Sequence, residues 1–100
     1  MLEVSRMERP MQSKRFRERV FTAAELEYLS GRSLQSAAGL LCAKEALAKA
    51  MGISIFTALK TVEIGHTPEG RPIVIKPGGF EVSITHTKGI AAAVVQKKLK

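Results

Sequence analysis

The sequence is poor in cysteine and in long apolar runs, and each shortage excludes a class of protein. The single cysteine, Cys42, cannot form an intrachain disulfide, and no Cys/His spacing matches a zinc site. No apolar run approaches the roughly 20 residues that span a bilayer. The charged stretch from Met1 to Arg19 lacks the apolar centre of a secretory signal. We therefore expect a cytoplasmic protein with no membrane contact.

Acidic and aromatic residues are also few. Sixteen Lys and Arg against nine Asp and Glu give a net charge of +7, with the basic residues gathered near the two ends. Such a balance implies an anionic partner, which can be nucleic acid, a phosphorylated ligand or an acidic protein. Only Phe16 and Phe21 lie among the N-terminal basic residues. This scarcity argues against a surface on which single-stranded nucleic acid stacks.

The order of hydrophobic patterns predicts helices first and strands afterwards, in one domain covering residues 1–100. The expected helices are 11–20, a short one that begins with a capping box at Thr22, and a long one from Leu34 or Ser36 to Met51 with Gly52 as C-cap. The expected strands are the end of one in 2–7, then 58–64, 71–76, 81–87 and 90–96. We therefore predict an α+β fold, with helices packed on a small antiparallel sheet that the long helix covers.

The long helix carries a carboxylate between two lysines in an otherwise apolar sequence. Glu45 and Lys49 are four residues apart and share one helical face. The simplest interpretation is a surface ion pair, worth roughly a few tenths of a kcal/mol. If the helix is buried, however, Glu45 needs a cation to stay charged. A magnesium ion, with substrate phosphates and water as its other ligands, would supply that cation.

A histidine lies near the end of an expected strand. Alternation over 82–87 places His86 on the same face as two apolar residues, close to a turn. Either His86 caps the edge of the core, or it joins Glu45 in a magnesium and phosphate site. His66 falls in a predicted turn and receives no role. Cys42, on an apolar helix, is expected to be a packing residue.

Four segments in the right order and spacing resemble the holo-(acyl-carrier-protein) synthases, which are small 4′-phosphopantetheinyl transferases. They are Arg15-Phe16 with Arg19–Thr22 and Glu25-Leu26, Ala43–Ala46 with Lys49 and Gly52, Val62–Ile64 with Gly70–Pro72, and Val82–Thr87 with Ala91–Val95. The resemblance covers almost the whole chain. It implies magnesium-dependent transfer of the 4′-phosphopantetheine arm from coenzyme A to a serine of apo-acyl-carrier protein. Adenosine 3′,5′-bisphosphate would be the other product.

The resemblance also assigns roles by position. The catalytic residues would be Glu45, Lys49 and His86, with Glu45 as the magnesium ligand. The residues along coenzyme A would be Lys44, Lys49, Gly52, His86 and Thr87. The acidic acyl-carrier protein would dock on Arg6, Arg15, Phe16 and Arg19. Family members of this size are homotrimers with active sites between subunits, so we expect a homotrimer.

Two positions differ from the family pattern. The family's first strand carries Gly-x-Asp, whose aspartate is a second magnesium ligand, and Leu2–Arg6 matches the residues just after it. We therefore expect the natural protein to start several residues earlier, so that this sequence lacks the beginning of that strand. In addition, Leu40-Leu41 replaces the family's Arg-Phe.

Two other functions fit parts of the sequence. One is a catalytically weak or inactive relative that binds coenzyme A or an acidic carrier protein. The other, supported by charge alone, is a small basic nucleic-acid-binding protein, and we expect no nucleic-acid partner. A steep fall of DNA affinity with salt would favour that last interpretation.

Overall fold

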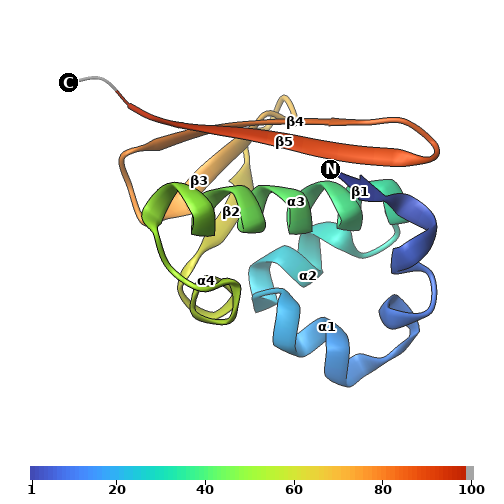
Figure 1. Cartoon of the computed structure of the whole chain (residues 1–100). Helices are drawn as coiled ribbons and strands as arrows, with labels where there is room; N and C mark the ends of the chain where they lie inside the picture. The colour runs from blue at the N-terminus through green and yellow to red at the C-terminus, as the bar shows by residue number, and fades with distance from the viewer. Residues whose placement is uncertain (99–100) are drawn as a thin grey trace.

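The computed structural model describes residues 1–98 and arranges them in layers, with one long helix in the middle (Figure 1). A long β-hairpin lies on one side of this helix, and three shorter helices lie on the other. The helices are α1 (Lys14–Val20), α2 (Ala23–Leu29), α3 (Leu34–Met51) and α4 (Ile55–Thr61), with short 3-10 turns at Val4–Met7 and Pro10–Gln12. Among residues 1–98, none of these helices combines the length and apolar character needed to cross a membrane.

The strands form two antiparallel sheets. The larger has the order β1-β5-β4 and the smaller pairs β2 with β3. Their bounds are Leu2–Glu3 for β1, Glu63–His66 for β2, Pro72–Lys76 for β3, Phe80–His86 for β4 and Ile90–Lys97 for β5. In the larger sheet, Ala91 of β5 lies opposite both Leu2 and His86. The α+β class is confirmed, but the single sheet expected from the sequence is divided into two.

The α3 helix is the centre of the core, as its apolar sequence predicted. Leu40 and Leu47 are almost completely buried, because the other helices cover one side of α3 and the β4–β5 hairpin covers the other. A side chain at Gly39 would place its Cβ 2.8 Å from a methyl carbon of Ile84, so glycine allows β4 to pack closely there. Gly52 ends the helix in the left-handed conformation, at φ 69°, as expected for a C-cap.

The strand predicted over 58–64 was wrong, because its first half is helix α4. The Ser54 side chain caps this helix by accepting a hydrogen bond from the Thr57 amide. Ala58 and Val62, four residues apart, are fully buried, so the segment follows helical periodicity. The β-branched residues in this segment favoured a strand, and tertiary packing overrode that preference.

In the N-terminal segment, too, helical turns replace part of a predicted strand. The first strand ends at Glu3, and a 3-10 turn follows where the sequence predicted extended chain. This turn buries Val4 and Met7, three residues apart, which one helical turn can place on the same side. Helix α1 begins at Lys14, after Ser13, whose side chain accepts a hydrogen bond from the Phe16 amide.

Candidate functional site

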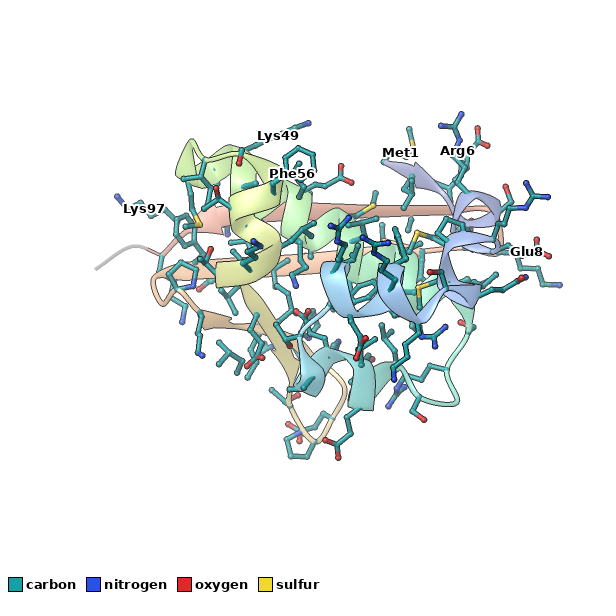
Figure 2. The ribbon with its side chains drawn as sticks, turned by 90° about the horizontal axis from the view of Figure 1, so that it is seen from below. Met1, Arg6, Glu8, Lys49, Phe56 and Lys97 are labelled. Atoms are coloured by element: carbon teal, nitrogen blue, oxygen red, sulfur yellow. The ribbon has the colours of Figure 1, made fainter. Side chains whose placement is uncertain are left out.

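Glu45 and Lys49 lie on the exposed side of α3. Both are solvent-exposed, and within residues 1–98 the structure contains no ion pair between them. Figure 2 shows Lys49 pointing outward, on the same side of the molecule as Met1 and Phe56. The burial argument for a cation at Glu45 was therefore wrong. Water alone can keep this carboxylate charged, and it stands open to an external ligand.

The described residues do not form a complete metal site at this face. In residues 1–98 there is no group of three or more His, Cys, Asp or Glu that could hold an ion. All nine acidic residues of the chain are glutamates. Magnesium is often bound through one or two carboxylates together with substrate phosphates. Glu45 fits that role only in company with oxygen atoms brought by a phosphate ligand.

The buried charge of α3 is Lys44, not Glu45. Its side chain is fully buried, and its Nζ donates to Glu25 Oε1 at 2.6 Å and to the Val20 carbonyl at 3.0 Å. Glu25 is equally buried and also accepts hydrogen bonds from the amides of Thr22, at 2.9 Å, and Ile64, at 2.8 Å. Four segments therefore meet at this pair: the end of α1, the start of α2, the middle of α3 and β2.

This arrangement contradicts the prediction that Lys44 lies along coenzyme A. Its ammonium is enclosed by protein and already has two acceptors, so it cannot also reach a surface ligand. The sequence did contain a partial signal for Glu25. The capping box predicted that Glu25 would accept from the Thr22 amide, and it does. Its partnership with Lys44, 19 residues away, had no local signature.

His86 and Glu45 are not brought together within one chain. His86 ends β4, and its Cδ2 lies 3.7 Å from where a Cβ on Gly39 would stand. Glu45 is six residues further along α3, about 9 Å in axial rise, and faces another direction around the helix. Thr87 shapes the turn after β4, where its hydroxyl oxygen accepts hydrogen bonds from the amides of Gly89 and Ile90. The structure therefore does not place His86 beside Glu45.

Comparison with known proteins decides the family. The sequence profile of the 4′-phosphopantetheinyl transferase superfamily matches residues 2–95. The chain belongs to this superfamily. Holo-[acyl-carrier-protein] synthase of Exiguobacterium sp. is 38% identical over 102 residues, covering 94% of this chain and 84% of the relative. The corresponding enzyme of Bacillus subtilis is 40% identical over 92 residues, covering 82% of this chain and 76% of the relative.

Two crystal structures have a similar fold. A holo-(acyl-carrier-protein) synthase from Bacillus anthracis, in complex with CoA (3′,5′-ADP), has a TM-score of 0.82 at 29% identity, over 94% of this chain and 87% of that one. The Helicobacter pylori enzyme in complex with coenzyme A has a TM-score of 0.85 at 24% identity, over 97% and 95% of the two chains. The second likeness concerns the fold. The predicted family and the α+β architecture are confirmed.

In this transferase-superfamily chain, the residues expected to meet a carrier protein lie on two elements. Arg15 and Arg19 are exposed and four residues apart on α1, and Phe16 is half-buried beside them. Arg6 is on the first 3-10 turn instead, and its Nε lies 3.9 Å from a carboxylate oxygen of Glu3, both side chains being exposed. An exposed pair of this kind is worth about 0–1 kcal/mol, so it leaves Arg6 free to change partners.

Cys42 has the packing role that the sequence indicated. Its thiol is buried and donates a hydrogen bond to the Ala91 carbonyl at 3.4 Å. Burial raises the pKa of Cys42, the nearby N-terminal ammonium lowers it, and the charge of Glu45 raises it further. A thiol with a raised pKa is a poor nucleophile at neutral pH, so Cys42 is not a candidate for catalysis.

His66 has surroundings that the sequence did not reveal. It is the last residue of β2, not part of a turn, and its ring stacks on Tyr28 with centroids 3.6 Å apart. The guanidinium of Arg32 lies 4.0 Å from the same Tyr28 ring. His66 Nδ1 is buried and has no hydrogen-bond partner among the described residues. Burial, followed by the charge of Arg32, lowers the pKa of His66. A small pocket of about 100 Å³ separates His66 from His86.

This lowered pKa predicts a pH-dependent stability. The unfolded chain binds the His66 proton more readily than the folded one, so the free energy of unfolding should fall as pH drops below about 6.5. His66→Phe keeps a stacking ring that cannot titrate, and should flatten the dependence between about pH 7.5 and 5.5. Urea denaturation across this range measures it. Tyr28→Phe, which retains both the stack and the titrating ring, should keep the slope. An unchanged slope in His66→Phe would contradict the assignment.

Proposed function

We propose that this chain transfers the 4′-phosphopantetheine arm of coenzyme A to a serine of apo-acyl-carrier protein. The products are holo-carrier protein and adenosine 3′,5′-bisphosphate. One observation carries the proposal: in a chain with holo-[acyl-carrier-protein] synthases as relatives, α3 presents Glu45 and Lys49 to solvent on one face, with no ion pair between them. A carboxylate can bind the metal that accompanies a pyrophosphate, and an ammonium beside it can pair with the phosphate oxygens.

Each residue of this face has a distinct task. Glu45 is the protein ligand for magnesium, and Lys49 places a positive charge against the phosphates of coenzyme A. Gly52, exposed at the end of α3, lets the ligand approach the backbone because it carries no side chain. When bound, magnesium neutralises the pyrophosphate and stabilises the charge that develops on the leaving group. The serine of the carrier protein is delivered by docking on the basic residues of α1.

A homotrimer completes the site under this proposal. Within one chain, His86 lies beside Gly39 of α3 rather than beside Glu45. Ile73 and Ile75 of β3 and Val94 of β5 are exposed, and Ile73 and Val94 line a hollow of about 400 Å³. An exposed apolar patch of this kind is typical of a protein interface. We propose that further copies of the chain cover it, so that Glu45 and Lys49 act with His86 and Thr87 of the partner subunit.

The direct test is conversion of apo- to holo-carrier protein, followed by mass spectrometry, with the purified chain, coenzyme A and magnesium. Reversing Arg15 and Arg19 to Glu should raise the KM for carrier protein by tenfold or more. This corresponds to about 1.4 kcal/mol or more in total for two contacts that become repulsive. The KM for coenzyme A should change little. Lys76→Glu with Lys97→Glu, an equal change of charge on exposed residues of the sheets, is the matched control.

Three outcomes distinguish the alternatives. No conversion by the wild-type chain, despite binding of both substrates, would identify an inactive relative. An equal loss of affinity for coenzyme A and carrier protein in the α1 variant would mean that α1 is not a protein dock. A similar rise in the KM for carrier protein in the control would mean that net charge, rather than the position of the arginines, causes the effect.

A further inference from the structure

A groove runs between α1 and α4. On its α1 side it includes Phe16 and Arg19, which are already expected to meet the carrier protein, whereas its α4 side has no role so far. It has a volume of about 440 Å³ and is lined by Phe16, Arg19, Val20, Phe56, Leu59 and Lys60. Phe56 is 77% exposed, which is unusual for so large an apolar side chain. In Figure 2 it lies on the side of the molecule from which Lys49 projects.

Helix α4 packs against the core without using Phe56. The helix already buries Ala58 completely and follows it with buried Val62, so its inward face is satisfied without Phe56. The groove thus has apolar walls from both helices, while Arg19 and Lys60 add positive charge at its sides. None of its lining residues is acidic. A partner that fills it must combine apolar side chains with negative charge.

We propose that this α1–α4 groove receives an apolar side chain from an acidic amphipathic helix of the carrier protein, with Phe56 as the anchor. The inference rests on the proposed function, and adds α4 to a dock otherwise placed on α1 alone. A few residues, with aromatic and arginine side chains enriched among them, dominate the binding energy of an interface, especially where they fill a pocket that excludes water. An amphipathic helix laid in an apolar groove is a recurrent mode of recognition.

A second copy of the chain is a poorer occupant for this groove. Each copy carries a net charge of +7, so it offers Arg19 and Lys60 fewer acidic side chains than an acidic carrier protein does. The face with Ile73, Ile75 and Val94 offers copies a more apolar surface. The two helices therefore affect different steps of carrier-protein binding. The exposed arginines of α1 mainly raise the rate of encounter, and the α1–α4 groove slows dissociation.

The test measures binding separately from catalysis. The ligand is an apo-acyl-carrier protein whose acceptor serine is replaced by alanine, titrated into the full chain by calorimetry. We expect Phe56→Ala to weaken this binding about tenfold, through a faster dissociation rate, with no change in the affinity for coenzyme A. Phe56→Leu keeps an apolar side chain and should lose much less. Thr61→Ala, an exposed change on the same helix, is the matched control and should bind as the wild type does.

Each contrary result has a definite meaning. Unchanged carrier affinity in Phe56→Ala overturns the proposal, as does a wild-type chain that binds no carrier protein. Loss of coenzyme affinity in the same variant would assign the groove to coenzyme A. A fall in molar mass by light scattering would assign it to a second copy. The carrier protein in this titration lacks its acceptor serine, so the binding results do not depend on catalysis. The proposed function is tested separately, and it fails only if the wild-type chain cannot convert intact apo-carrier protein.

Discussion

Replacing Lys44 by methionine should destabilise the protein by about 3–5 kcal/mol, because it leaves the Glu25 carboxylate buried without its cation. Both side chains are fully buried, and the Lys44 Nζ–Glu25 Oε1 distance is 2.6 Å. The substitution also removes the donor to the Val20 carbonyl. A domain of this size has a total stability of about 5–15 kcal/mol, so the loss is a large share of it. Urea denaturation at pH 7 measures the change.

The double variant Lys44→Met with Glu25→Gln separates a buried charge from poor packing. It removes both charges, so it should be more stable than Lys44→Met alone by about 1–3 kcal/mol. It should not return to wild-type stability. The substituted amide offers one acceptor oxygen where the two carboxylate oxygens of Glu25 serve the amides of both Thr22 and Ile64, and an unmade buried hydrogen bond costs about 1–3 kcal/mol. A double variant less stable than Lys44→Met would show that the pair is not held together by its charges.

Local signals in the sequence were sufficient for α2 and α3. The capping box at Thr22 and the left-handed Gly52 depend on residues within a few positions, and both occur as predicted. The β4–β5 hairpin was also placed correctly, because its alternation is regular and its turn is short. These elements are specified by the chain segment that forms them, so no knowledge of the tertiary structure was needed.

The identity of the buried charge on α3 could not be obtained in the same way. Lys44 and Glu45 are neighbours in an apolar sequence, and either could face inward. The choice depends on Glu25, on another helix, and on the Val20 carbonyl at the end of α1. The same limit applies to His66, whose stacking partner Tyr28 is 38 positions away in sequence. Contacts between distant segments decided these positions, and periodicity does not encode them.

Replacing Glu45 by glutamine should lower transferase activity by at least about a hundredfold. A bound metal typically supplies several kcal/mol of charge stabilisation in the transition state, and each 1.36 kcal/mol is a factor of ten in rate. Glu45 belongs to no group of three or more metal-ligating side chains in the described residues, so no such cluster can replace the lost carboxylate. Because Glu45 is exposed, the free energy of unfolding should change by only about 0.5 kcal/mol or less.

Magnesium dependence is the decisive measurement for this variant. In the wild type, coenzyme A titrated by calorimetry should bind more tightly with magnesium than with a chelator present, because Glu45 and the pyrophosphate share the ion. In Glu45→Gln the two titrations should coincide. Glu27→Gln, which neutralises an exposed carboxylate on α2, is the matched control and should keep the wild-type difference. If Glu45→Gln retained both the magnesium effect and full activity, Glu45 would be an ordinary surface residue and the metal would be bound elsewhere.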